Sequence, residues 1–382
     1  MTSGTKRPSG AAGTHPGALA ARRASRPLDP AGQVDLSHLA GARWAGPLPG
    51  FVPPELATLV KEAPEGDAWL HEIKFDGIRT LAGVEDGSVR MYSRNGKDWT
   101  DRFPELAGEL AVLPVKNALL DGEVVMQLSD GTTSFEKLVE ALGPATSPGG
   151  RPESGRKGHS DGRLLYYVFD LLCLDGFDLL GVPLEKRREL LRRILARAGE
   201  EGRLRFSESL RGDGRTVLEE ACRSGLEGVV SKRMATPYRP GVRGTDWVKS
   251  KCRRRQEFVI GGFTDPSGAR TGFGALLLGV YTPRGLQYIG KVGTGFDEER
   301  LASLSRRLRE IETVDPPFVA KVPAAAARRK SVHWVRPELV AEVEFMEWTA
   351  GGSLRHPSFA GLREDKSPQE VVAEIPAEGQ IR

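Results

Sequence analysis

The sequence contains few cysteines and few histidines. Its 382 residues include three cysteines, Cys173, Cys222 and Cys252, and six histidines. The cysteines are odd in number and lack CxxC spacing, and the histidines form no cluster with them. We therefore expect neither a disulfide scaffold nor a structural zinc site.

Long hydrophobic runs and a strong charge of one sign are also missing. No apolar stretch approaches the roughly 18–20 residues that a membrane-spanning helix needs. The polar start MTSGTKRPSGAAGTHPG lacks the apolar core of a signal peptide. A formal net charge of +4 permits an anionic partner without identifying one. We expect a soluble intracellular protein with enough chain for two domains.

Composition divides the chain into three parts. Residues 1–50 are rich in Gly, Ala, Pro and Arg without a sustained period, which predicts a mostly disordered basic arm. Residues 51–252 carry short β-rich segments and one clear amphipathic helix, and the Pro/Gly/Ser-rich stretch 143–163 predicts a mobile loop. Residues 253–382 combine short strands, Gly-rich turns and one helix, as in a small OB-type barrel. Strands and helices without a regular βαβ rhythm predict an α+β protein.

Charged residues interrupt a strand-like pattern in LHEIKFDGIR, residues 70–79. Successive strand residues point to opposite faces, so Glu72, Lys74 and Asp76 would share one face, and Arg79 follows shortly after. A solvated strand face with a weak ion pair would explain this row equally well. This stretch alone leaves both interpretations open.

Later strand-like segments repeat such polar rows. The residues concerned are Asp121 and Glu123 in DGEVV, Glu227 in GLEGVV, and Trp247, Lys249 and Lys251 in WVKSKC. Any one row could be an ordinary solvated face. Several rows that carry both carboxylates and lysines favour one anionic ligand together with a divalent cation.

The order of these segments resembles the ATP-dependent DNA ligases of the covalent nucleotidyltransferase superfamily. The resemblance rests on KFDGIR (74–79), SRNG (93–96), DGE (121–123), YVFDLL (167–172), EGVV (227–230), WVKSK (247–251) and RHPSFAGLREDK (355–366). WLHEIKFDGIR, YIGKVGTGF and LRHPSFAGLREDK further resemble the ligase component of bacterial non-homologous end-joining ligases of the LigD type. The resemblance implies a stand-alone ligase module, with a nucleotidyltransferase (adenylation) domain of antiparallel sheets and helices over 51–252 and an OB-fold domain over 253–382.

The resemblance implies that Lys74 is a nucleophile. Its amine would attack the α-phosphate of ATP, giving lysyl-AMP and pyrophosphate. The amine must be neutral to attack, whereas carboxylates on the same face favour the ammonium form. Lys249, Lys251 and a bound Mg²⁺ or Mn²⁺ would offset those carboxylates and neutralise charge in the transition state.

The resemblance also assigns roles to the remaining motif residues. It implies Glu72 at the adenine amino edge, Phe169 on the base, Trp247 in the nucleotide pocket, Arg79 and Glu123 at the ribose, Glu227 and Asp76 at the metal, Arg94 at the 5′-phosphate of the nick, and Arg363, Asp365 and Lys366 at the pyrophosphate. For each residue, a surface charge or a core aromatic is the plainer alternative.

The implied reaction continues on DNA. AMP would pass to the 5′-phosphate of a nick, and the 3′-hydroxyl would then displace it. The OB-type domain would have to swing between these steps, with its hinge at Arg253 to Gln256. Duplex binding would rest on phosphate contacts, for which Lys97, Arg102, Arg156 and Lys157 are weaker candidates than Arg94.

Other functions and partners remain open at this stage. An RNA ligase or a capping-type guanylyltransferase would share the lysine motif, and a catalytically idle DNA-end-binding module is a third alternative. Expected partners are nicked or broken duplex DNA, a Ku-type end-binding protein and a separate repair polymerase. We expect a monomer, since no coiled-coil heptads occur, in the bacterial cytoplasm and associated with the nucleoid.

Overall fold

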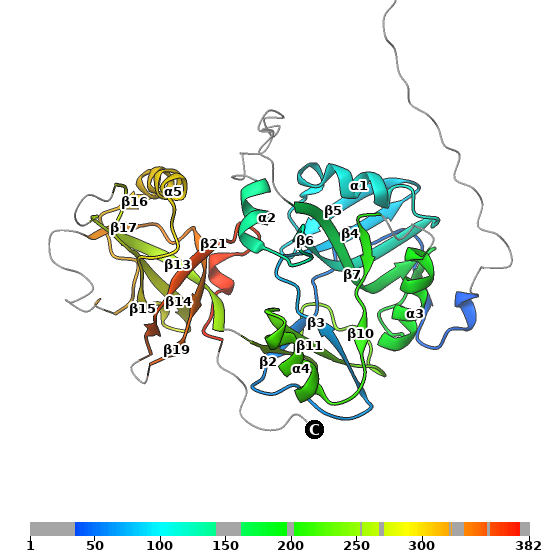
Figure 1. Cartoon of the computed structure of the whole chain (residues 1–382). Helices are drawn as coiled ribbons and strands as arrows, with labels where there is room; N and C mark the ends of the chain where they lie inside the picture. The colour runs from blue at the N-terminus through cyan, green and yellow to red at the C-terminus, as the bar shows by residue number, and fades with distance from the viewer. Residues whose placement is uncertain are drawn as a thin grey trace, which may run out of the picture.

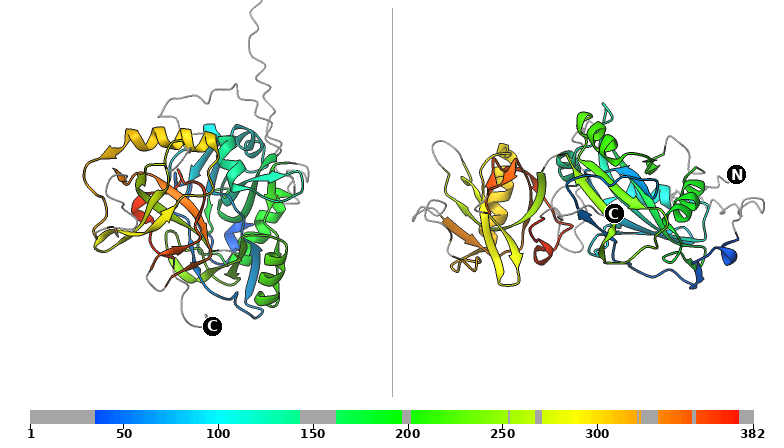
Figure 2. Two further views of the ribbon diagram at one scale, coloured as in Figure 1. Left: turned by 60° about the vertical axis from the view of Figure 1, so that its left-hand side comes forward. Right: turned by 90° about the horizontal axis from the view of Figure 1, so that it is seen from below.

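The computed structural model describes residues 35–142, 162–196, 202–252, 254–266, 271–320, 322, 332–349 and 352–374. They form two domains side by side, the first ending at 252 and the second beginning at 254 (Figure 1, Figure 2). In these ranges, no helix has the length and apolar character needed to cross a membrane. Residues 1–34 of the predicted arm and 143–161 of the predicted loop lie outside the described residues.

The first domain contains two mainly antiparallel sheets. The larger has the order β1-β8-β7-β6-β4-β5 with β9 beside β7, and the smaller has the order β10-β3-β11-β12-β2. The larger sheet comprises β1 (Arg43–Trp44), β4 (Ile78–Glu85), β5 (Ser88–Ser93), β6 (Asn117–Leu128), β7 (Gly162–Leu174), β8 (Phe177–Asp178) and β9 (Leu204–Phe206). The smaller comprises β2 (Leu56–Leu59), β3 (Trp69–Ile73), β10 (Ser209–Leu210), β11 (Gly228–Arg233) and β12 (Arg243–Lys251). The β-rich segments expected from the sequence are strands here.

Apolar side chains of both sheets meet in a shared core. Leu70, Leu81, Leu119, Phe169 and Trp247 belong to one buried cluster. Both faces of β3 are therefore covered, and only Ile73 at its end is exposed. Of the predicted polar row, only Glu72 lies in β3, where it is buried, whereas Lys74 and Asp76 follow the end of the strand and are partly buried. The interpretation of this row as a solvated strand face is therefore wrong.

Helices cover the outer parts of the first domain. They are η2 (Leu36–His38), η3 (Thr100–Arg102), α1 (Pro104–Leu110), α2 (Phe135–Leu142), α3 (Leu184–Leu195) and α4 (Gly214–Arg223). The leucines and Ile194 of the amphipathic helix α3 are buried, and Arg187 and Arg188 are buried with them. Buried carboxylates bind both guanidinium groups, Asp170 for Arg187 and Glu72 for Arg188.

The first domain includes residues that precede Phe51. Leu36 packs into the main core, and β1 pairs with β8 through Arg43–Asp178 and Trp44–Phe177. Residues 36–44 thus belong to the domain, not to the arm predicted over 1–50. A strand of two residues is too short for a periodic pattern to reveal it.

The second domain is built on a long strand, β13, that pairs with β14, β17 and β18. Its elements are β13 (Arg254–Thr264), β14 (Leu276–Thr282), β15 (Gly285–Val292), α5 (Glu298–Glu310), β16 (Glu312–Thr313), β17 (Val332–Val335), β18 (Val340–Phe345), β19 (Glu347–Trp348), β20 (Leu354–Arg355), β21 (Ser358–Leu362) and η4 (Pro368–Glu370). A separate apolar cluster fills its interior. These strands and the interposed helix agree with the expected OB-type domain.

The two domains meet at α2, which stands beside β21 (Figure 1). The ring of Phe135, 1% exposed, lies under the guanidinium groups of Arg255 and Arg363, 5.2 and 4.9 Å from its centroid. A Cβ added to Gly361 would come within 3.2 Å of this ring. An ion pair at 2.5 Å between Arg300 and Glu136 extends the contact. The domains are therefore closed on each other.

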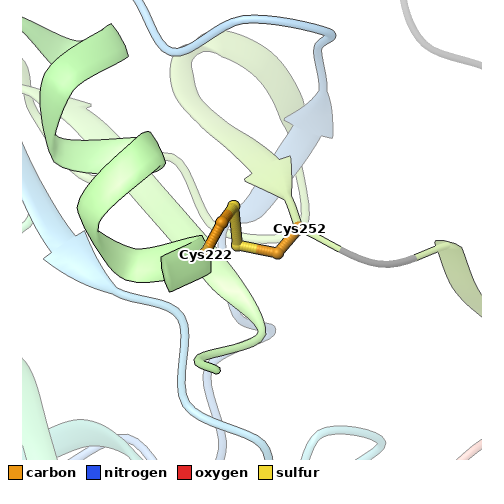
Figure 3. Close-up of a disulfide and its surroundings, with 2 residues drawn as sticks. All are labelled: Cys222 and Cys252. Carbon is orange, nitrogen blue, oxygen red and sulfur yellow. A yellow bond between two sulfur atoms is a disulfide. The ribbon is translucent and has the colours of Figure 1, made fainter. Parts of the chain in front are cut away.

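One disulfide joins Cys222, at the end of α4, to Cys252, just after β12 (Figure 3). The sequence did not point to this bond, because the two residues are separated by 30 positions and share no motif. Packing of α4 beneath the smaller sheet brings them together. The buried Cys173 is a free thiol.

Candidate active site

Lys74 follows β3 in a turn that presses against neighbouring strands. Its backbone N–H donates to the Gly228 carbonyl at 2.9 Å. A Cβ on Gly77 would lie 2.2 Å from the Val124 carbonyl oxygen, and one on Gly228 would lie 2.1 Å from that of Ser250. Glycine is thus required at both positions, since any side chain would collide with backbone. These close approaches place Lys74 beside Glu227.

One pocket between the domains collects most of the residues that the sequence singled out. Those that line it are Glu72, Lys74, Asp76, Arg79, Arg94, Glu123, Phe169, Glu227, Trp247, Lys249, Lys251, Arg363 and Lys366. Asp365, which is 1% exposed, does not line it, and neither do Asp121, Lys97 and Arg102. Arg156 and Lys157 lie outside the described residues. We call the part around Glu72, Arg79, Phe169, Lys232 and Trp247 the aromatic end. The part around Lys74, Asp76, Glu227, Lys249 and Lys251 is the ionic end.

At the aromatic end, Glu72 is held by buried cations. Its carboxylate accepts from Arg188 Nη1 at 2.6 Å, Lys232 Nζ at 3.0 Å and Ser207 Oγ at 3.0 Å. The Lys232 ammonium also stands 4.1 Å from the ring centroids of both Phe169 and Trp247. Glu72 therefore reaches the pocket with a fixed orientation.

Strand pairing suggests Glu123 as the partner of Arg79, but Arg79 binds Asp121 instead. It lies opposite Glu123 in the β4–β6 register, yet its guanidinium makes a two-pronged bond to Asp121 at 2.7 and 2.6 Å. Tyr238 donates its hydroxyl to the same carboxylate at 2.7 Å. The guanidinium then lies 4.7 Å from the Phe169 centroid. Arg79 is thus locked beside the aromatic rings, and Glu123 stays directed to the pocket.

The ionic end contains Lys74 and two carboxylates. Lys74 Nζ lies 2.5 Å from Glu227 Oε2, and Asp76 forms an ion pair with Arg255 of the second domain. Burial pushes the pKa of Glu227 upward, but the Lys74 and Lys251 ammonium groups outweigh it and bring this pKa below its ordinary value. Burial, with repulsion from Glu227, raises the pKa of Asp76 to about 6.

Lys249 and Lys251 meet a carboxylate from the far end of the described chain. Glu374 accepts from Lys249 Nζ at 2.6 Å and from Lys251 Nζ at 3.1 Å. Burial and the neighbouring Lys251 charge lower the pKa of Lys249 to about 8. Although burial opposes it, the two ammonium groups bring the pKa of Glu374 to about 2. The three groups thus form a charged buried cluster.

The second domain contributes a cationic wall. Lys366 Nζ lies 3.0 Å from Glu257 Oε1, and Arg363 bonds to Asp365 at 2.8 and 2.7 Å and to Glu342 at 3.0 Å. Arg363 and Lys366 face the pocket, whereas Asp365 orients Arg363 from behind. Asp365 therefore acts on the site through its partner.

Six carboxylates line this one pocket, and the Lys74 charge acts on three of them, Asp76, Glu123 and Glu227; the others are Glu72, Glu257 and Glu342. Burial raises the pKa of Glu123 to about 7, despite the nearby Lys74 and Arg79 charges. A divalent cation would relieve this crowding. In the described ranges no group of three or more His, Cys, Asp or Glu forms a metal cage. However, Mg²⁺ and Mn²⁺ commonly take one or two carboxylates and fill the other positions with water and phosphate oxygens, so the residues fit such an ion.

Sequence reasoning missed several residues in and around the pocket. Lys232 and Glu257 line the pocket, whereas Arg188, Arg255 and Glu374 form ion pairs with residues that line it. Lys232 ends the EGVVSK segment and could have been found there, because it continues a strand already marked by Glu227. Arg255 lies in the segment predicted as a hinge, but its ion pair with Asp76 was not predicted. Arg188, Glu257 and Glu374 lie in segments without a quoted motif, and only their contacts reveal them.

Two family models match the chain over most of its described length. Residues 54–251 match the model described as ATP dependent DNA ligase domain, and residues 269–366 match the model described as ATP dependent DNA ligase C terminal region. Each range falls within one of the two domains of the structure.

Curated relatives and a solved structure agree with these matches. The multifunctional non-homologous end joining protein LigD of Pseudomonas aeruginosa is 44% identical over 334 residues, which cover 87% of this chain and 38% of the relative. The LigD protein of Mycobacterium tuberculosis strain H37Rv is 41% identical over 307 residues, which cover 80% of this chain and 37% of that protein. This chain thus spans less than two fifths of either relative.

A solved mycobacterial DNA ligase D, described as complexed with ATP and MES, superposes with a TM-score of 0.58. It is 40% identical, and the match covers 85% of this chain and 98% of that one. The expected α+β architecture, a nucleotidyltransferase domain followed by an OB-fold region, is confirmed by this match and by the family models.

Proposed function

The chain belongs to the family of ATP-dependent DNA ligases, and we propose that it seals nicks and broken ends in duplex DNA through a lysyl-AMP intermediate on Lys74. The observation that carries this proposal is the single pocket that holds the Lys74 amine, the aromatic end and the cationic wall together. A nucleotide needs all three, because its base, its α-phosphorus and its leaving group are parts of one molecule.

In the first step, Lys74 Nζ attacks the α-phosphorus of ATP and pyrophosphate leaves. The amine must lose a proton first, and Glu227, 2.5 Å away, is the acceptor within reach. Lys249, Lys251, Arg363 and Lys366 supply positive charge to the phosphates as the bond breaks. Asp76 and Glu227 would hold Mg²⁺ or Mn²⁺, which when bound adds further charge neutralisation.

The aromatic end would bind the nucleoside. Glu72, anchored by Arg188 and Lys232, presents a carboxylate that can accept from an exocyclic amine such as that of adenine. The ring of Phe169 would stack on the base, and Arg79 and Glu123, which line the same pocket, would contact the ribose hydroxyls. The indole N–H of Trp247 is buried and has no hydrogen-bond acceptor among the described residues.

The later steps require duplex DNA in place of pyrophosphate. AMP passes from Lys74 to a 5′-phosphate, for which Arg94 is our proposed contact, and a 3′-hydroxyl then displaces AMP. The second domain must rotate to admit the duplex, with its hinge between residues 252 and 257. Binding through phosphates would weaken steeply with added salt.

End joining is the proposed setting, by analogy with the LigD relatives. A Ku-type end-binding protein and a separate repair polymerase are the partners that such a role needs. Because the substrate is chromosomal DNA, we place the protein, as a monomer, with the nucleoid in the bacterial cytoplasm.

The deciding experiment incubates the full chain with α-labelled ATP or GTP and Mg²⁺ or Mn²⁺, then adds duplex DNA with a single nick. Label from ATP should appear on the protein and disappear as the nick closes. Lys74→Ala should abolish the adduct, whereas exposed Lys61→Ala should not change it. Labelling from GTP would instead favour a capping-type enzyme, and absence of an adduct would refute an enzymatic role.

A further inference from the structure

The segment after η4 runs from the second domain to the pocket. Val371, 5% exposed, packs in the second-domain core, and its carbonyl accepts from the Tyr281 N–H at 2.7 Å. The side-chain amide of Gln256 then forms two hydrogen bonds with the backbone of the residues that follow Val371. Its Nε2 donates to the Val372 carbonyl at 2.9 Å, and its Oε1 accepts from the Glu374 N–H at 3.0 Å. The segment is thus guided along β13 to the ionic end.

The Glu374 carboxylate occupies the position between Lys249 and Lys251. These side chains are 17%, 15% and 11% exposed, so the bonds of 2.6 and 3.1 Å form mostly out of water. Lys249 and Lys251 lie two positions apart in β12, so their side chains share one face of the strand. Both line the pocket that holds Lys74. A carboxylate therefore sits where the site gathers positive charge for an anion.

A phosphate group and Glu374 would compete for these lysines. Both are anions that accept hydrogen bonds from ammonium groups, and two anions close together in a poorly solvated pocket repel strongly. Glu257, 3.0 Å from Lys366 in the same pocket, adds to the negative charge. Nucleotide phosphates can therefore use the full charge of the two lysines only after Glu374 has left.

We propose that Glu374 is an internal competitor of the nucleotide: before ATP arrives its carboxylate holds Lys249 and Lys251 in place, and the phosphates displace it on binding. The inference rests on the proposed function of the pocket. On displacement, the segment loses its hydrogen bonds to Gln256, while Val371 stays packed in the core of the second domain. The tail thereby couples nucleotide entry to a local opening at the start of β13, next to the hinge.

The first test compares wild type with Glu374→Gln in single-turnover labelling of the protein over a range of ATP concentrations. The variant keeps the side-chain shape but removes the charge. The half-saturating ATP concentration should fall about 5- to 30-fold, while the maximal rate changes less than about twofold. Glu338→Gln, an exposed glutamate of the same domain paired with Arg336, should leave both quantities unchanged.

The direction in which the half-saturating ATP concentration changes shows whether Glu374 competes with the nucleotide or supports its binding. A raised half-saturating concentration or a lower maximal rate in Glu374→Gln would mean that the carboxylate supports catalysis, and would overturn the proposal. An unchanged half-saturating concentration would overturn it as well. A misfolded variant cannot mimic tighter binding, so the expected result is specific.

A second test does not depend on catalysis. Calorimetry would measure binding of an ATP analogue with a methylene bridge between its α- and β-phosphorus atoms to wild type, Glu374→Gln and a chain ending at Ala373. Both variants should bind more tightly than wild type. Hydrogen exchange in wild type should also rise at the Glu374 amide when the analogue binds. Equal binding by all three proteins would refute the inference, whereas failure of the labelling experiment alone would refute only the proposed function.

Discussion

The two ends of the pocket differ in where their charged residues find partners. At the aromatic end, Glu72 is held by Arg188 and Lys232, and Arg79 by Asp121. All of these residues belong to the first domain. At the ionic end, Asp76 binds Arg255 of the second domain, and Lys249 and Lys251 bind Glu374 of the following segment.

This difference shows which part of the site exists before the domains close. The aromatic end is assembled by folding of the first domain alone, because its ion pairs stay inside one packed core. The ionic end depends on the second domain, so its electrostatics change whenever that domain moves. A nucleoside pocket would be permanent, whereas the phosphate environment would exist only in the closed state.

The largest expected effect is a loss of stability when the aromatic end loses its carboxylate. Glu72→Gln leaves the buried Arg188 and Lys232 without a counter-charge, which should lower the free energy of unfolding by about 3–5 kcal/mol. Urea unfolding would measure it. The matched control is Glu208→Gln, which breaks an exposed pair with Arg192 and should cost less than about 1 kcal/mol. Similar losses in both variants would contradict a preformed aromatic end.

At the ionic end, a substitution at Arg255 should change the rate of lysyl-AMP formation more than it changes the free energy of unfolding. Arg255→Met removes the bond from the second domain to Asp76, so the closed state should be populated less. Formation of lysyl-AMP should slow about 100-fold, equivalent to about 2.7 kcal/mol. Sealing of a nick that already carries AMP should change little, because that step follows opening.

Single-turnover assays of the two steps would measure this split. Arg336→Met, which removes an exposed arginine of the same domain, is the control and should affect neither step. Equal slowing of both steps would show that Arg255 only supports the fold.

The smallest expected effect is a pH dependence of the aromatic end. Glu55, 1% exposed, accepts from the Arg239 N–H at 2.8 Å, and its carbonyl accepts from Arg79 at 3.3 Å. Burial raises its pKa from 4.5 to about 7. The folded protein therefore binds a proton that the unfolded chain has lost. This contribution to stability is full below about pH 4.5 and is lost as the pH rises to about 7.

Glu55→Gln removes that titration, so the variant should gain about 2.5 kcal/mol relative to wild type between pH 5 and pH 8. Chemical unfolding at several pH values would measure this difference. A constant difference across the range would mean that Glu55 is ionised in the folded protein throughout.

The sequence alone determined the elements and the motif residues. Alternating apolar residues marked the strands, and the spacing of leucines marked α3, because periodicity follows from local backbone geometry. The order of the motifs indicated the family and brought Lys74, Glu227 and Lys249 into consideration before any contact was known. These features are local, so a single chain segment contains all the information that they require.

Only the tertiary structure decided which charged side chains form ion pairs and which cysteines form the disulfide. Asp121, not Glu123, binds Arg79; Glu374 reaches Lys249 from 125 residues away; and Cys222 meets Cys252. Periodicity tells which face a side chain occupies, but its partner depends on how separate elements pack and on which buried charges need neutralising. The structure therefore assigned the partners, because the cost of burying an unpaired charge acts only once the chain has folded.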